Sequence, residues 1–187
     1  FKGTSRRSAL EIAEAFDRVG GESNAFTSHE HTCYHARVLS DQLPMAVDVL
    51  ADMFTGAVLD PEEFDRERGV ILEEIAMDRD DPMDFAFEQF NAEVLHGSAL
   101  ARPIAGTPEE IRSVTRDAVW RHYRGAYRPE NLVVTVAGGL EHENVVRLVR
   151  ESLVRAGWDP DEPAAAGARR RTLVAQPRPL VGTHTFE

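Results

Sequence analysis

A long helix bracketed by two Asp-Pro pairs is the feature that most constrains the fold of this chain. Asp60-Pro61 opens a segment with helical spacing, and Asp81-Pro82 opens the next one. Aspartate caps the free N–H groups of a first helical turn, and proline is tolerated there because its missing N–H would have no partner. We therefore predict a helix over residues 61–80, followed directly by a second helix.

Glu67 and Glu74 lie on the same side of this predicted helix. At 100° per residue, seven residues bring Glu74 to within about 20° of Glu67, two turns further along. Arg68 and Glu73 fall on the flanks, where charges are expected. The line between the glutamates is bordered by apolar residues, namely Phe64, Val70, Ile71, Ile75 and Met77. Both carboxylates are therefore predicted to lie inside an apolar arc.

A carboxylate in an apolar arc is costly unless it is paired, hydrogen-bonded or bound to a metal. Two interpretations follow. In the first, the arc lies at the edge of the helix, and both acids reach water or an arginine. In the second, one glutamate is a metal ligand and the other supports it.

Residues 29–35 concentrate three of the seven histidines and the only cysteine of the chain. In a single strand, His29, His31, Cys33 and His35 would all point to one face. Same-face neighbours on a strand are separated by about 6.5 Å, so a shared ion would need ligands from elsewhere. We therefore interpret this stretch as part of a strand or hairpin and not as the metal site.

The remaining patterns indicate an α+β fold. Extended patterns occur at 23–39 and in the β-branched run of 131–139, which we predict to be a buried strand. Helical spacing occurs at 8–19, from 44, 82, 108 and 115 onward, and over 142–156. The expected architecture is a mixed, mostly antiparallel sheet with long helices packed on it.

Composition excludes some partners. A net charge of −11 argues against nucleic-acid binding, because an acidic surface repels phosphate backbones. No apolar run is long enough to span a membrane, so no membrane partner is expected. A single cysteine rules out an internal disulfide and fits a reducing compartment, which favours a cytoplasmic location.

Several blocks of the sequence resemble one known family in order and spacing. The blocks are FKGT, GGESNAFTSHEHTCYHARVL, AVDVLADMFTGAVLDPEEFDRERGVILEEI and PIAGTPEEIRSVTRDAVWRHYRGAYRPENLVVTVAGGL. The chain is thus similar, over roughly residues 1 to 155, to the pitrilysin, insulin-degrading enzyme and mitochondrial processing peptidase family of zinc peptidases. The resemblance is closest to bacterial processing-peptidase-like members. It implies a processing-peptidase-like metallohydrolase domain.

In that family, zinc is held by the two histidines of an inverted H-x-x-E-H motif and by a downstream glutamate. The resemblance assigns the ligand position to Glu74 and the supporting position to Glu67. The family's motif directly precedes F-K-G-T, so we expect it just upstream of Phe1. Neither H-x-x-E-H nor H-E-x-x-H occurs within these 187 residues. The chain itself therefore supplies one zinc ligand of three and no general base.

The resemblance also implies how a substrate is held. Asn24 and Ala25 match edge-strand residues that, in relatives, contact the backbone of an extended peptide. The alternative for Asn24 is a turn residue following Gly20-Gly21.

The expected organisation is that of half an enzyme. Residues 1–158 are predicted to form an N-terminal peptidase half-domain, 159–176 a flexible loop, and 177–187 the start of a further strand of the same domain. A second homologous half-domain, in the same chain or in a partner subunit, is expected to complete it. The implied function is a zinc metalloendopeptidase, inactive without the upstream motif. The alternative is a non-catalytic scaffold or partner subunit of the same fold.

Overall fold

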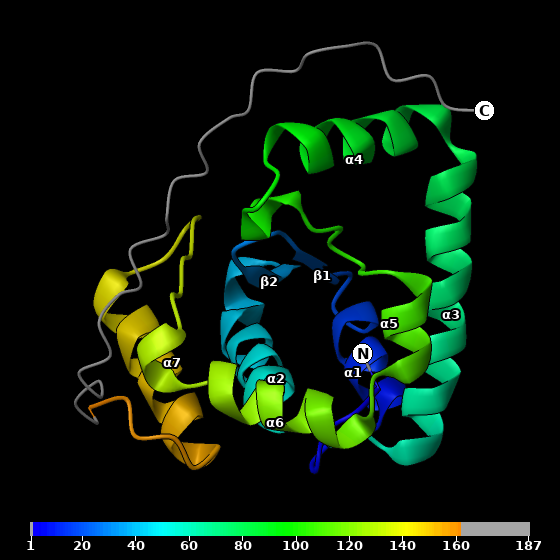
Figure 1. Ribbon diagram of the computed structural model, residues 1–187. Coiled ribbons are helices and arrows are strands. Elements are labelled where there is room, and N and C mark those ends of the chain that lie inside the picture. Colours follow the sequence, from blue (N-terminus) through cyan, green and yellow to red (C-terminus); the bar gives the residue numbers. More distant parts are fainter. Residues whose placement is uncertain (1, 162–187) are drawn as a thin grey trace. The chain divides into compact units, whose positions relative to one another are not determined.

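The structure is a computed structural model that describes residues 2–161, and this part of the chain forms two compact units (Figure 1). The first unit comprises residues 2–26, 32–64 and 115–161, and the second comprises 27–31 and 65–114. The predicted strand at 177–187, and the predicted loop at 159–176 beyond its first three residues, lie outside the described residues.

The first unit is a set of helices packed against a β-hairpin. The hairpin consists of β1 (Glu22–Thr27) and β2 (Thr32–Arg37). The helices are α1 (Ala9–Asp17), α2 (Leu43–Thr55), α6 (Arg116–Ala126) and α7 (His142–Arg155), with short 3-10 turns η1 (Ser40–Gln42) and η3 (Pro129–Asn131). Helix α2 is central, because it packs against α1, β2 and α7.

The core of this unit lies between α1 and α2. Its buried members recur at helical spacing along the two helices: Ile12, Phe16, Ala46, Val49 and Met53. Tyr34 and Ala36 of β2 pack against this cluster. One face of the hairpin is thereby joined to the two helices.

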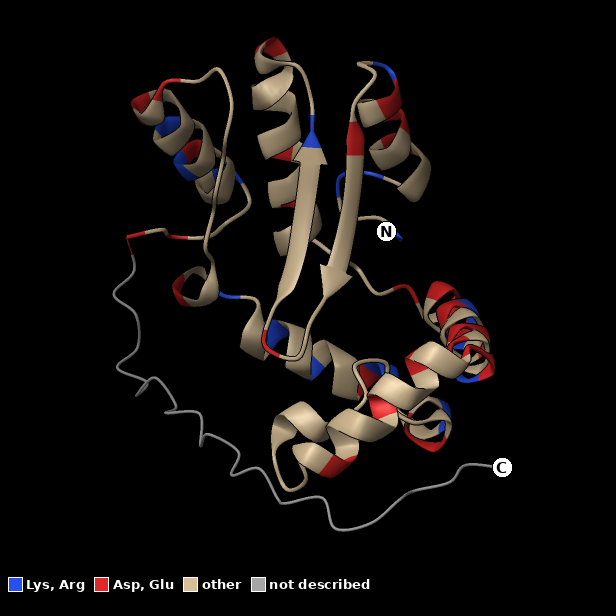
Figure 2. Cartoon of the chain, turned by 90° about the horizontal axis from the view of Figure 1, so that it is seen from above, with Lys and Arg blue, Asp and Glu red and all other residues tan. Residues whose placement is uncertain are grey.

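The hairpin confirms the extended pattern predicted over 23–39. The two strands run antiparallel, as Figure 2 shows. They are joined by a turn in which the Ser28 N–H donates to the carbonyl of His31 at 2.8 Å. Within the described residues, β1 pairs with no strand other than β2.

The predicted strand at 131–139 is not formed. Asn131 belongs to η3, and residues 132–136 form no ladder with any other described segment. The side chain of Val133 is accordingly exposed, with 83% of its surface accessible. A β-branched run becomes a strand only where a neighbouring strand and a packed face are available.

The second unit is helical. It contains α4 (Pro82–Val94), η2 (Ala99–Ala101), α5 (Pro108–Ser113) and all but the first turn of α3 (Pro61–Asp80). The bounds of α3 confirm the helix predicted over 61–80. The Asp60 carboxylate caps it by accepting from the N–H groups of Glu62 and Glu63 at 2.9 and 3.1 Å. Among the described helices, none is sufficiently long and apolar for a membrane span.

Candidate functional site

Helix α3 carries Glu67 and Glu74, the two predicted metal-site carboxylates. The side of the helix that is buried differs from the apolar arc predicted around them. Ile75 is buried, and Phe64, Arg68 and Ile71 are half-buried, so the inward-facing line advances by three or four residues at a time. Val70 and Met77 were expected to border this face, but both are exposed, Met77 to 72%. The apolar arc is therefore narrower than the sequence pattern indicated, and it is centred on the side of Phe64 and Ile71.

Arg68 was placed on a solvated flank, and this expectation is wrong. Its guanidinium is half-buried and donates to two backbone carbonyls at the end of α5. One nitrogen donates to the carbonyl of Ile111, and Nη2 donates to that of Val114 at 2.9 Å. Carbonyls at a helix C-terminus have no partner inside the helix, and a cation is favoured there. The signal available in the sequence was the four-residue spacing between Phe64 and Arg68.

Glu67 is half-buried and Glu74 is exposed on the same helix. Acidic side chains recur along α3, as the colouring of Figure 2 shows. Within residues 2–161, the Glu74 carboxylate takes part in no hydrogen bond or ion pair. It is therefore available to a cation, and carboxylate oxygen is an accepted zinc donor.

Glu74 fits a zinc site as one ligand and no more. No group of three or more His, Cys, Asp or Glu side chains that could hold a metal ion occurs in the described part of the chain. A structural zinc site needs four ligands, and a catalytic one needs three from the protein. Any zinc bound by Glu74 therefore needs further ligands from outside residues 2–161.

The edge-strand pair lies on β1 in the first unit. Asn24 is exposed and Ala25 is half-buried. The Asn24 Oδ1 accepts the N–H of Ala25 at 2.8 Å. With Ser28 and His31 as a hydrogen-bonded pair, the alternation of an antiparallel ladder directs the Ala25 N–H away from β2. The outer edge of β1 thus presents backbone groups that β2 does not satisfy.

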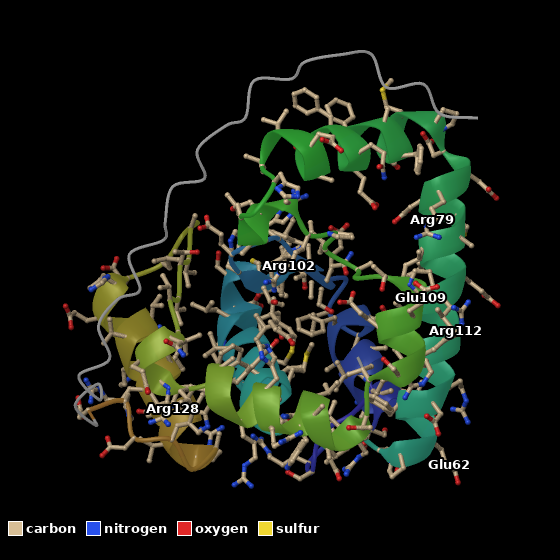
Figure 3. All side chains as sticks on the ribbon, in the orientation of Figure 1. Glu62, Arg79, Arg102, Glu109, Arg112 and Arg128 are labelled. Carbon is tan, nitrogen blue, oxygen red and sulfur yellow. The ribbon has the colours of Figure 1, made fainter. Side chains whose placement is uncertain are left out.

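The histidine-rich stretch is divided between a turn and a strand. His29 and His31 lie in the turn, so they do not share a strand face with Cys33 and His35, as they would in a single strand. The His29 Nε2 is 3.1 Å from the carbonyl oxygen of Arg102, whose side chain is labelled in Figure 3. The His31 Nδ1 is 2.9 Å from the Ser28 hydroxyl. Each of these two rings thus has a hydrogen-bond partner within the protein.

A charge cluster in the first unit was missed at the sequence level. Asp52 of α2 is only 2% exposed, and it accepts from the Thr4 hydroxyl at 2.8 Å and from Arg7 Nη1 at 2.7 Å. Arg7 and Arg6 also donate to Asp48, one helical turn earlier. Two aspartates spaced by four in an otherwise apolar helix were the available signal. The cluster fastens the segment around Thr4 to α2.

Electrostatics within this cluster favour the ionised form of Asp48. Partial burial acts to raise the pKa of Asp48, but hydrogen bonds and positive charge from Arg7 and Arg6 outweigh it. The pKa of Asp48 therefore lies below its ordinary value.

Three tyrosines support the same end of α2. The Tyr123 hydroxyl donates to the carbonyl of Phe54 at 2.9 Å and accepts the N–H of Ala57 at 3.3 Å. The hydroxyls of Tyr34 and Tyr127 lie 3.1 Å apart. Burial raises the pKa of Tyr34 and of Tyr123. The hydroxyl groups of these three tyrosines thus all have hydrogen-bond partners near the C-terminal end of α2.

Helices packed on an antiparallel hairpin, followed by a long helix that carries two glutamates seven residues apart, make up an α+β domain. Residues 1–108 match the family described as Insulinase (Peptidase family M16), and the chain belongs to this family. The resemblance to zinc peptidases and the predicted fold class are thereby confirmed.

Similar proteins support this assignment. The chain is 48% identical over 189 residues to an uncharacterized zinc protease of Streptomyces coelicolor, covering 99% of this chain and 41% of that protein. It superposes with a TM-score of 0.80 on a protease from Helicobacter pylori at 23% identity, covering 88% of this chain and 40% of the other. It also superposes on a domain from Pseudomonas fluorescens described as a peptidase M16 inactive domain, with a TM-score of 0.74, 16% identity, and coverage of 89% and 40%. The chain thus spans about two fifths of each of these proteins. Because the same fold occurs in a protease and in an inactive domain, the fold alone does not decide activity.

Proposed function

We propose that the chain is the metal-binding half-domain of a zinc-dependent metalloendopeptidase that cleaves peptides or unfolded protein segments. The observation that carries the proposal is the Glu74 carboxylate, which is exposed on α3 with no hydrogen bond or ion pair within residues 2–161. Membership of the peptidase M16 family, with a relative named as a zinc protease, supports zinc as the metal.

In this proposal, Glu74 is the ligand that the chain contributes and Glu67 supports the metal site. Zinc, when bound, would polarise the scissile carbonyl and lower the pKa of the attacking water. The remaining two ligands and the general base would come from an H-x-x-E-H motif upstream of Phe1. The outer edge of β1, at Asn24 and Ala25, would hold the backbone of an extended peptide by strand addition.

The proposed enzyme is larger than this chain. Residues 1–158 would form one half-domain, and a second homologous half-domain, in the same chain or in a partner subunit, would complete the enzyme. The single cysteine favours a cytoplasmic location.

The proposal is tested on the natural full-length protein. We expect wild-type protein to retain about one zinc per active half-domain after dialysis, measured by elemental analysis, and to cleave a quenched fluorescent peptide. Glu74→Gln should lose both properties, because an amide is a much poorer zinc donor than a carboxylate. Glu73→Gln is the matched control, since Glu73 is the exposed neighbour on the same helix. Unchanged zinc affinity and activity in Glu74→Gln would refute the ligand assignment.

The second candidate function is a non-catalytic scaffold or partner subunit. The observation that favours it is the similarity in fold to the inactive domain from Pseudomonas fluorescens. The same measurement separates the two functions. Full-length wild-type protein that binds no zinc and cleaves no peptide would support the scaffold and exclude the peptidase.

A further inference from the structure

We propose that Arg68 is a positioning residue that fixes the rotation of α3 and thereby the direction of its metal-site carboxylates. The inference rests on the proposed function, in which Glu74 binds the metal. It concerns contacts that lie entirely within the second unit. Arg68 directly follows Glu67 and precedes Glu74 by less than two turns, so a constraint at Arg68 acts on both.

The constraint is a two-point attachment. The guanidinium of Arg68 donates to the carbonyls of Ile111 and Val114 through separate nitrogens. A planar guanidinium held at two points cannot swivel as a single-point contact can, and this is the property that distinguishes arginine from lysine. Asp65, one turn earlier on α3, lies 3.7 Å from the Nη2 of Arg68 and adds charge on its solvent side.

The attachment point is a capped helix. Helix α5 begins with a capping box, in which the N–H of Thr107 donates to Glu110 at 2.9 Å and the N–H of Glu110 donates back to the Thr107 hydroxyl at 3.2 Å. Gly106 precedes it with a φ of +79°, and a Cβ there would lie 3.3 Å from the Glu110 carboxylate. The positive φ makes any other L residue at Gly106 strained, and the capping box holds the start of the helix whose C-terminal carbonyls accept from Arg68.

If α3 rotated after losing the Arg68 attachment, its carboxylates would move by a distance that is large for a metal site. A carboxylate on a helix lies about 6 Å from the helix axis, so a rotation of about 10° moves it by about 1 Å. Ligand geometry must be held to within about 0.5 Å. Losing the Arg68 attachment should therefore weaken metal binding even though Arg68 touches no metal.

The test compares arginine variants of the full-length protein. Arg68→Ala should lower zinc affinity about tenfold, measured by competition with a chromophoric chelator well below the unfolding temperature. It should also alter the visible absorption of the cobalt-substituted protein, which reports ligand geometry. Arg68→Lys should recover only part of the affinity, because a single ammonium cannot reproduce the two-point attachment.

Arg79→Ala is the matched control. Arg79 is exposed near the C-terminal end of the same helix, as Figure 3 shows, and it lies nearer to Glu74 in sequence than Arg68 does. The substitution removes the same charge without removing an attachment to α5, so zinc affinity should change less than twofold. A loss in Arg79→Ala equal to that in Arg68→Ala would assign the effect to charge and overturn the inference.

The outcomes separate this inference from the proposed function. If Glu74→Gln keeps wild-type zinc affinity, the proposed function fails. If Glu74→Gln weakens zinc binding while folded Arg68→Ala binds zinc like wild type with an unchanged cobalt spectrum, only the positioning role fails. Should Arg68→Ala not fold, Arg68→Lys decides. Reduced affinity with an altered spectrum supports the role, and wild-type values for both overturn it.

Discussion

Nη1 of Arg7 lies 2.7 Å from the Asp52 carboxylate and joins two segments that are 45 positions apart in the sequence. The same carboxylate accepts from Thr4 at 2.8 Å, and the N–H of Ser5 donates to the carbonyl of Gly56 at 3.1 Å. The first turn of the described chain is thus attached to the C-terminal end of α2.

Asp52→Asn should lower the free energy of unfolding by about 2 to 3 kcal/mol, because charge-assisted hydrogen bonds to a buried carboxylate are lost. The midpoint of urea denaturation measures the change. Asp17→Asn is the control, since Asp17 is exposed, and it should stay within about 0.5 kcal/mol of wild type. Equal effects of the two substitutions would contradict the stabilising role of Asp52 in the charge cluster.

The stability contributed by Asp48 should disappear in acid. Its pKa is lower in the folded protein than its ordinary value, so its contribution is fully present above about pH 4 and is lost as the pH falls through the folded pKa. Urea midpoints measured from about pH 7 to about pH 2 should therefore show wild type and Asp48→Asn converging below about pH 4. A difference that stays constant across this range would count against this explanation.

Two glycine-to-alanine substitutions should change the stability of the protein in opposite directions. A Cβ at Gly56 would lie 2.9 Å from the Asp52 carbonyl oxygen, so Gly56→Ala should destabilise the protein by about 1 to 3 kcal/mol. Gly69 lies within α3 and has open space where a Cβ would lie, so Gly69→Ala should stabilise the protein by up to about 1 kcal/mol. Thermal unfolding of both variants measures the difference, and a shift in the same direction for both would contradict the argument.

Tyr123→Phe should cost about 1 to 3 kcal/mol, because the carbonyl of Phe54 and the N–H of Ala57 both lose their partner. Tyr127→Phe is the comparison. It removes a hydroxyl that contacts the Tyr34 hydroxyl, itself able to rotate, so a smaller loss is expected. Chemical denaturation in the same buffer distinguishes them.

The sequence predicts those features that depend on neighbouring residues. Helix α3 is predicted from Asp60-Pro61, which caps its first turn, and from Asp81-Pro82, which opens α4, and its bounds are confirmed. The hairpin is predicted from alternation. By contrast, residues 131–139 have the composition of a strand, but strand formation depends on partners that a local pattern does not specify.

The same distinction applies to the candidate site. The seven-residue spacing places Glu67 and Glu74 on one side of a helix, which the helix geometry fixes. It does not reveal that Arg68 turns inward, because the acceptors at Ile111 and Val114 lie more than forty positions away. The metal-ligand and substrate-binding roles of Glu74, Glu67, Asn24 and Ala25 remain predictions.

The bond from the Ala25 N–H to the Asn24 side chain also bears on how the protein behaves in concentrated solution. A strand edge that accepts any extended peptide through its backbone can also accept a copy of itself, which is a route to aggregation. By occupying one outward-pointing donor, the Asn24 side chain covers part of this edge. A strand that pairs with this edge would have to displace the asparagine side chain from the Ala25 N–H, which adds a cost to edge-to-edge pairing.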